Sequence, residues 1–332
     1  MAQMAVLVTG GAGYIGSHMA LALTDAGIET IIIDNLSTGF AWCVSPQATL
    51  MRGDIGDDGF VLKVMREHKF DAVIHFAGSI VVPDSVSDPL AYYLNNTVKS
   101  RTLMECAVKA KIPNFIFSST AAVYGNPEQL PIDETGALRP ISPYGTSKLM
   151  TELMLRDSHL AYGLNYVALR YFNVAGADPQ GRSGQSSPRA THLIKVASQA
   201  ALGQRKELEV FGNDYDTPDG TCVRDYIHVS DLISAHMKAL THLQGGGQSG
   251  VFNCGYGRGY SVLDVIGAVE RASGTKLPVK MVARRTGDPA GLVAGAGKAR
   301  HVLGWEPAHD DLDFIVSSAL AWERHLQRRN AA

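Results

Sequence analysis

The sequence predicts an α/β protein with a doubly wound parallel sheet and a smaller mixed α/β domain. Short β-branched runs alternate with longer helical stretches through the first half of the chain. The runs are continuously apolar, as strands covered on both faces should be. Strand, helix and strand repeated in this way build a parallel sheet. The predicted strands are residues 4–8, 30–33, 71–76, 114–118 and 165–171, and the predicted helices are 14–26, 59–68, 89–110 and 142–160.

The regular alternation of predicted strands and helices ends after about Asn173. Residues 177–188 are rich in Gly, Ser, Pro and Gln, which predicts an exposed loop, and 245–250 predicts a flexible one. Mixed elements follow: helices at 193–202, 229–242 and 262–272 and a strand at 208–211. We therefore expect a nucleotide-binding domain over 1–175 and a smaller domain over 176–332. The chain should cross back to the first domain around 222–245.

Composition excludes several classes of protein. The formal net charge of the 332 residues is −2, so bulk electrostatics draws the chain neither to nucleic acid nor to an anionic membrane. We find no signal peptide and no run of about 18 apolar residues. The four cysteines are far apart, which predicts buried free thiols in the reducing cytoplasm and no metal site. They are Cys43, Cys106, Cys222 and Cys254.

The strongest local signal is a glycine-rich turn that follows the first predicted strand and opens the first predicted helix. Its sequence is TGGAGYIG, with Gly10, Gly13 and Gly16 three residues apart. Glycine permits a tight turn, a close approach of the backbone to a pyrophosphate, and close packing of helix on strand. The helix N-terminus then offers free N–H groups to the phosphates. A ligand-free turn is the rival interpretation, but the strand–turn–helix context favours a Rossmann dinucleotide site.

Asp34 ends the second predicted strand, where a carboxylate accepts hydrogen bonds from both hydroxyls of an adenine ribose. A 2′-phosphate there would be repelled, and no Lys or Arg follows until Arg52 to bind one. The sequence therefore favours NAD over NADP. Asp54 and Ile55 are candidates to flank the adenine.

A candidate proton-transfer pair lies in the helix predicted over 142–160. Tyr144 and Lys148 are four residues apart and so share one helix face. A free tyrosine is a poor base at neutral pH, but a nearby ammonium and a positive nicotinamide ring favour the phenolate. Thr120, just past the strand predicted over 114–118, can bridge the substrate and Tyr144. Tyr124, by contrast, is interpreted as structural.

With these motifs in place, the chain resembles the extended short-chain dehydrogenase/reductase family, and within it the UDP-glucose 4-epimerases. The likeness runs from Val6 to Trp305. The segments that carry it are TGGAGYIG (9–16), HFAG (75–78), YYLNN (92–96), FSSTAAVYG (117–125), PYGTSKLM (143–150), RYFN (170–173), FGNDY (211–215), DGTCVRDYIHV (219–229) and RRTGD (284–288).

The resemblance implies roles for individual residues. Tyr144 would be the base, Lys148 its electrostatic partner and Thr120 the bridging hydroxyl. The implied NAD contacts are Gly10, Gly13, Tyr14, Ile15, Gly16, Asp34, Asn35, Leu36, Ser37, Thr38, Gly39, Asp54, Ile55, Phe76, Ala77, Gly78, Asn95, Tyr144, Lys148 and Phe172. The implied contacts to a UDP-sugar are Thr120, Tyr144, Asn173, His192, Leu193, Glu209, Val210, Phe211, Arg224, Tyr226, Arg285, Asp288 and Leu292.

The chain departs from the family pattern at three places. Ser79-Ile80 stands where family members often carry a lysine near the cofactor. His192 replaces an asparagine. The position that gates the sugar pocket is Leu292, which is intermediate in size, so the sequence leaves open whether an N-acetyl group is admitted.

The resemblance implies reversible 4-epimerisation of UDP-glucose and UDP-galactose, through a 4-keto sugar and bound NADH, by a homodimer joined at the helices over 89–110 and 142–160. UDP-N-acetylglucosamine, UDP-glucuronate or a UDP-pentose are alternative substrates. A 4,6-dehydratase usually carries an Asp-Glu pair after the Thr, whereas Ala121 and Ala122 stand here. A non-catalytic NAD-sensing protein is a remote alternative, because such proteins tend to lose the Tyr/Lys pair.

Overall fold

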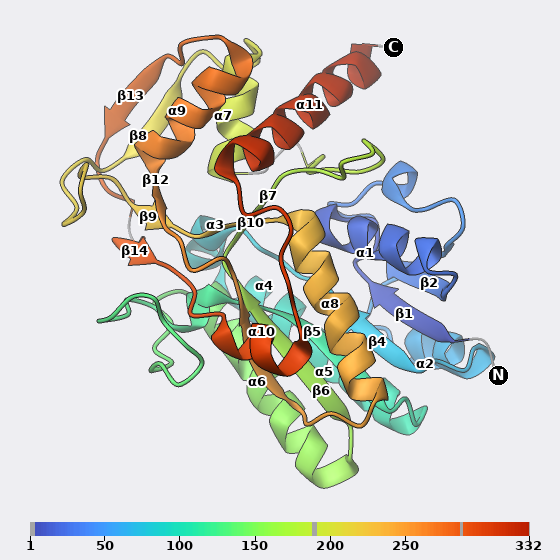
Figure 1. Ribbon diagram of the computed structural model, residues 1–332. Helices are drawn as coiled ribbons and strands as arrows, with labels where there is room; N and C mark the ends of the chain where they lie inside the picture. The colour runs from blue at the N-terminus through green and yellow to red at the C-terminus, as the bar shows by residue number, and fades with distance from the viewer. Residues whose placement is uncertain (1–3, 188–190, 286–287, 332) are drawn as a thin grey trace.

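The computed structural model describes residues 4–187, 191–285 and 288–331. Within them, a seven-stranded parallel sheet forms the centre of the molecule, in the order β11-β6-β5-β4-β1-β2-β3 (Figure 1). This confirms the predicted doubly wound class. The sheet strands are β1 (Ala5–Thr9), β2 (Glu29–Asp34), β3 (Thr49–Arg52), β4 (Ala72–His75), β5 (Asn114–Thr120), β6 (Asn165–Tyr171) and β11 (Gly250–Cys254).

Helices cover both faces of this sheet. Alternate residues of β1 show why: Val6 and Val8 belong to the core beneath α1 (Tyr14–Asp25) and α8 (Val229–Gln244), whereas Leu7 belongs to the core on the other face. That other core lies beneath α2 (Asp58–Glu67), α5 (Lys99–Lys109) and α6 (Pro143–Tyr162). Both faces of the central strands β1, β4 and β5 are thus buried, which explains their continuously apolar runs.

All five strands predicted in the first half are present, but β3 and β11 were not predicted. β3 (Thr49–Arg52) is a short edge strand of four partly exposed residues, so it lacks the apolar run of a buried strand. β11 follows the glycine-rich stretch at 245–250, which dominates the local pattern. It pairs in parallel with β6 along its whole length.

The predicted helix over 89–110 is present as a continuous helical segment, but its middle is a π-helix, which was not predicted. The segment consists of α4 (Pro89–Tyr92), a π-helical stretch η2 (Tyr93–Val98) and α5. η2 carries Asn96, which is buried and bonded to both the N–H and the C=O of Ser79. The wider turn breaks the 3.6-residue periodicity, and such bulges are frequent at functional sites.

The second half forms smaller sheets and a group of helices. The predictions for 193–202, 208–211, 229–242 and 262–272 hold to within two residues. The two-stranded sheets are β7 (Asn173–Ala175) with β10 (Tyr226–His228) and β8 (Leu208–Phe211) with β13 (Val279–Val282). A third sheet joins β12 (Tyr260–Ser261), β9 (Val223–Arg224) and β14 (Gly291–Leu292). The remaining helices are α3 (Val82–Ser87), α7 (Leu193–Ala201), α9 (Val262–Ser273), α10 (Gly297–Leu303) and α11 (Leu312–Ala331), with 3-10 turns at Ala41–Cys43 and Ala121–Val123.

Parts of the second half lie against the first-half sheet. α8 packs beside α1 and over β5 and β6 (Figure 1). β11 extends the sheet at the edge of β6. By contrast, α7, α9 and α11 pack against one another at the other end of the molecule. The division into 1–175 and 176–332 remains a prediction.

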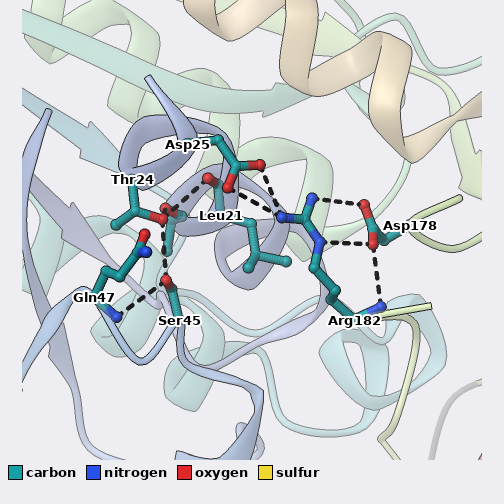
Figure 2. Close-up of polar contacts among 8 residues, drawn as sticks. Leu21, Thr24, Asp25, Ser45, Gln47, Asp178 and Arg182 are labelled. Atoms are coloured by element: carbon teal, nitrogen blue, oxygen red, sulfur yellow. Dashed lines mark hydrogen bonds and ion pairs between the residues drawn. The ribbon is translucent and has the colours of Figure 1, made fainter. Parts of the chain in front are cut away.

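The segment 177–188, predicted as an exposed loop, is docked onto α1. Arg182 forms ion pairs with Asp25 at 2.8 Å and with Asp178 at 2.9 Å (Figure 2). The hydroxyl of Ser183, which is fully buried, lies 2.7 Å from that of Ser17. The prediction of exposure was therefore wrong for Ser183, since a polar composition does not reveal partners elsewhere in the chain. Pro188 lies outside the described residues.

Two further observations bear on the class of protein. No helix in residues 4–187, 191–285 and 288–331 is long and apolar enough to cross a membrane. All four cysteines are buried and free, as predicted.

Candidate active site

The candidate site residues gather at one edge of the central sheet, where the carboxyl ends of parallel strands meet. Gly10 follows β1, Asp34 ends β2, Phe76 follows β4 and Thr120 ends β5. Ligands of open α/β sheets bind outside this edge. The topology thus brings together residues that are far apart in the sequence.

The glycine turn is shaped as a phosphate cradle. Gly10 has a φ of +73°, and a Cβ on it would lie 2.6 Å from the main-chain nitrogen of Ala77. A Cβ on Gly16 would lie 2.2 Å from the carbonyl oxygen of Gly10. Gly13, the N-cap of α1, has no side chain to occupy the first amide groups of the helix. These amides and the helix dipole suit an anionic pyrophosphate.

Asp34 is fixed in position by two main-chain amides. Oδ2 accepts from the N–H of Ala12 at 2.9 Å, and Oδ1 accepts from the N–H of Leu36 at 2.8 Å. Each carboxylate oxygen keeps a lone pair for a further donor. The carboxylate therefore ties the glycine turn to the end of β2 and can still accept from a ribose.

Asp54 links three segments beside this carboxylate. It accepts from Asn35 Nδ2 at 3.1 Å, from the N–H of Gly56 at 2.8 Å and from Lys99 Nζ at 2.6 Å. Burial raises the pKa of Asp54, but Lys99 and the other donors outweigh it and hold the pKa below its usual value. Lys99 was not predicted, because no motif surrounds it and only the fold brings it to Asp54.

Tyr144, Lys148 and Thr120 come together as the sequence predicts. Ser142 caps α6 by accepting from the N–H of Gly145 at 3.2 Å, and Tyr144 follows in the first turn. Burial raises the pKa of Tyr144, and a hydrogen bond with the Thr120 side chain opposes this. Burial lowers the pKa of Lys148 to about 8. Burial thus has the larger effect on the pKa of the Tyr144 phenol.

The Lys148 ammonium lies between strand β5 and the turn that follows β4. Its Nζ donates to the main-chain oxygen of Ser118 at 2.9 Å. A Cβ on Gly78 would lie 3.6 Å from the same Nζ, so the ammonium borders the turn after β4. The position lets one cation serve both the phenol and a cofactor lying on that turn.

One helical turn beyond Lys148, α6 is fastened to the sheet by a buried ion pair. Glu152 accepts from Arg170 Nη2 at 2.6 Å and also from the Ser119 hydroxyl, and both charged side chains are only 4% exposed. Arg170 also donates to the hydroxyl of Tyr124 at 2.9 Å. Tyr124 is thus part of this internal network, in agreement with its structural interpretation.

The departure at Ser79-Ile80 has a local explanation. The Ser79 hydroxyl accepts from Asn95 Nδ2 at 2.9 Å, and its main chain is bonded to Asn96. Ile80 is 52% exposed. The turn after β4 is therefore held by two asparagines of η2.

Some of the predicted UDP-sugar residues line a small cavity together. They are Asn173, His192, Leu193 and Tyr226, joined there by Gln185. Gln185 Nε2 lies 2.7 Å from His192 Nδ1. Burial, with a contribution from Lys195, lowers the pKa of His192 to about 4, so this histidine is neutral near pH 7.

The other predicted UDP-sugar residues lie on the small sheets. The Arg285 guanidinium stacks 4.0 Å from the Phe211 ring centre, and Arg224 Nη2 lies 4.0 Å from Asp288 Oδ1. Leu292 is paired with Arg224 on adjacent strands. The two residues before Phe211 differ in what they can offer a ligand. The Val210 side chain is buried, so only its main chain could contact a ligand, whereas the Glu209 side chain is exposed. Residues 286–287 of the RRTGD motif lie outside the described residues.

The fold and the site define an extended short-chain dehydrogenase/reductase enzyme: a dinucleotide cradle beside a buried Tyr/Lys pair on one helix. The family model described as "NAD dependent epimerase/dehydratase family" matches residues 6–255, and the chain belongs to this family. The chain is 60% identical to a UDP-glucose 4-epimerase of Azospirillum brasilense, over 97% of this chain and 93% of that protein.

Solved structures give the same result. The UDP-glucose 4-epimerase from Bifidobacterium longum in complex with NAD+ and UDP superposes with a TM-score of 0.92 at 40% identity, covering 97% of this chain and 98% of that chain. The UDP-Glc/GlcNAc 4-epimerase from Campylobacter jejuni superposes with a TM-score of 0.85 at 45% identity, covering 97% and 99%. The resemblance inferred from the motifs is thus confirmed.

Proposed function

We propose that this chain interconverts UDP-glucose and UDP-galactose by 4-epimerisation, with NAD as its retained cofactor. The single observation that carries the proposal is the buried group of Tyr144, Thr120 and Lys148 at the end of β5. It borders the turn after β4, which in turn contacts the glycine turn at Gly10. Family membership and the 60% identical relative support the same conclusion. The residues present fit NAD: the cradle excludes a Cβ at Gly10 and Gly16, and Asp34 is placed for a ribose.

Tyr144 acts as the base that takes the proton from the sugar's 4-hydroxyl, and Thr120 bridges the two. When bound, NAD would supply a hydride acceptor and donor for the sugar C4, and its positive ring would favour the phenolate form of Tyr144. Lys148 supplies a second positive charge from its seat on the Ser118 carbonyl. After the 4-keto sugar turns over, Tyr144 returns the proton to the oxygen. The reaction is redox-neutral because the hydride would also return to C4.

The UDP portion is held while the hexose stays free to turn. Arg224 and Arg285 offer forked donors to a diphosphate, and Arg285 is oriented by its stacking on Phe211. Firm binding of the remote nucleotide supports catalysis at the sugar, because that binding holds the intermediate in place.

Among the alternative substrates, Leu292 favours the plain hexose. It is partly buried and packs against the apolar cluster that includes Tyr124 and Phe172, which supports a fixed side chain at this position. For a dehydratase, acid and base groups would be needed next to Thr120. Ala121 and Ala122 stand there instead.

The chain acts as a homodimer in this proposal, and its compartment is the cytoplasm. Leu90, Leu94 and Val98 are 76%, 54% and 50% exposed, and Met150 and Leu153 on α6 are 40% and 41% exposed. An apolar face of this kind suits a second copy of the chain. The four free cysteines fit a reducing compartment.

The test is to incubate the purified protein with UDP-galactose, without added NAD, and to follow UDP-glucose by chromatography. Tyr144→Phe is measured beside Tyr166→Phe, a buried tyrosine at the opposite end of the sheet. We expect conversion by the wild type and by Tyr166→Phe, and a loss of about 10²-fold or more in Tyr144→Phe. No conversion by the wild type, even with NAD supplied, would overturn the assignment.

A further inference from the structure

We propose that Asp225 is a positioning residue that fixes the strand carrying Leu292, and so determines how large a sugar the pocket accepts. The inference rests on the proposed function. Asp225 stands between two predicted UDP-sugar residues, Arg224 and Tyr226, and its side chain is fully buried. It acts through Leu292, which is far from Asp225 in the sequence but hydrogen-bonded to it in the fold.

The main chain of Asp225 joins the strands that carry substrate residues. Its N–H donates to the carbonyl of Leu292 at 3.0 Å, and its carbonyl accepts from the N–H of Asn173 at 2.9 Å. β9 pairs with β14 and β10 pairs with β7 on either side of this residue. Asp225 is therefore the point at which Asn173 and Leu292 are held relative to each other.

The side chain of Asp225 fastens the segment that follows Leu292. Oδ2 accepts from the N–H of Ala294 at 3.2 Å and of Gly257 at 2.9 Å, and Oδ1 accepts from the N–H of Tyr256 at 3.0 Å. Three main-chain donors from two segments thus converge on one buried carboxylate. Hydrogen bonds to a charged group are each stronger than neutral ones, so this carboxylate is a firm anchor.

The atoms around the Asp225 carboxylate are closely packed. A Cβ on Gly255 would lie 2.6 Å from Ala294 Cβ and 2.7 Å from Asp225 Oδ2. On the other side, the N–H of Ile132 donates to the carbonyl of Val293 at 2.9 Å. Residues 292–294 are therefore held from both sides, and loosening the Asp225 side lets Leu292 move away from the pocket.

The test compares Asp225→Asn with Asp231→Asn. Asn has one acceptor oxygen and an NH₂ group, so at least one of the three N–H groups faces a donor. Asp231 is a matched control: it is also buried and accepts from the N–H groups of Ala308 and His309 and from the hydroxyl of Tyr256. Both aspartates bind Tyr256, but Asp225 accepts from its main-chain N–H and Asp231 accepts from its hydroxyl. The control therefore perturbs the same tyrosine without touching the contacts to residues 292–294.

The readout is selectivity: the ratio of kcat/KM for UDP-galactose to that for UDP-N-acetylgalactosamine. Where the wild type does not turn over the N-acetylated sugar, the reciprocal of that sugar's inhibition constant against UDP-galactose replaces the second value. We expect the selectivity to fall by about 5-fold or more in Asp225→Asn and to change by less than about 2-fold in Asp231→Asn. A merely structural role would lower both values of kcat/KM together and leave the ratio unchanged.

Gly255→Ala tests the same anchor without touching the carboxylate, and it covers the case in which Asp225→Asn does not fold. Its Cβ pushes Ala294 and Asp225 apart, so the selectivity should fall in the same direction. An unchanged ratio in the folded variants would overturn the inference. Failure of the wild type to convert UDP-galactose would instead overturn the proposed function, so the two failures are distinguishable.

Discussion

Lys148 and Ser118 are joined by a hydrogen bond in which Nζ donates to the main-chain oxygen at 2.9 Å. Ser118 lies in the strand that ends at Thr120, and Lys148 lies one helical turn beyond Tyr144. One bond therefore fixes the ammonium relative to both the phenol and the bridging hydroxyl. The chemistry of the site depends on this relationship between α6 and β5.

Replacement of Lys148 should change the pH dependence of the reaction. Burial lowers the pKa of Lys148 to about 8, so the ammonium predominates below pH 8 and is lost above it. We expect kcat of the wild type to fall as the pH rises through about 8. Lys148→Arg keeps its charge at any working pH, so its residual activity should not show this fall. A wild-type fall that persists unchanged in Lys148→Arg would assign the titration to another group.

Loss of the Glu152–Arg170 pair should destabilise the fold strongly. Removing one partner leaves the other charge buried without compensation, so Glu152→Ala should lower the free energy of unfolding by about 3–5 kcal/mol. The exposed Arg271–Asp313 pair, at 2.6 Å, is the control, and Asp313→Ala should cost less than about 1 kcal/mol. Chemical denaturation measures both. Equal losses in the two variants would contradict the prediction.

A side chain in the glycine turn should reduce the amount of NAD that the purified protein retains. Gly16→Ala places a Cβ 2.2 Å from the carbonyl oxygen of Gly10, so the cradle must widen and the retained NAD should fall to less than about a tenth of the wild-type level. Gly297→Ala is the matched control, because a Cβ there meets no atom within 4 Å. NAD released from the denatured protein is measured by absorbance and chromatography. Wild-type NAD content in Gly16→Ala would show that the turn does not hold the cofactor.

Buried histidines should make the protein sensitive to acid. Burial lowers the pKa of His75 to about 3 and those of His18 and His236 to about 4. Unfolded histidines bind protons below about 6.5, whereas these three do not until lower pH, so the unfolded state binds more protons. Their contribution to stability is therefore present above pH 6.5 and is lost as the pH falls toward 4. We expect Tm to drop by on the order of 10 °C between pH 7 and pH 5, and His75→Gln to make the drop smaller. A drop of the same size in His75→Gln would exclude a contribution from His75.

The sequence predicts those parts of the site that are local. The glycine turn, Asp34 and the Tyr144/Lys148 pair lie in short motifs, and the strand–turn–helix alternation places them at one sheet edge. Contacts between distant segments leave no such pattern. Lys99 reaches Asp54 across 45 residues, and Ala294 reaches Asp225 across 69.

The same reasoning explains the missed elements. β3 and β11 are strands because they pair with β2 and β6, not because of a long apolar run of their own. The π-helical turn at Tyr93–Val98 is paired to Ser79 and Ser147 through Asn96, and neither partner is near it in the sequence. A local periodicity therefore cannot predict these features, whereas it predicts the five main strands well.

The central claim is that the hydride removed from the sugar C4 is the one that returns to it, with bound NAD as the group that would carry it. The most direct measurement uses UDP-galactose carrying deuterium at C4, with the protein as purified, and locates the label in the product UDP-glucose by NMR and mass spectrometry. The account predicts that the product retains the deuterium at C4, because the sugar and the cofactor stay bound between the half-reactions. Product with hydrogen from solvent at C4 would contradict it.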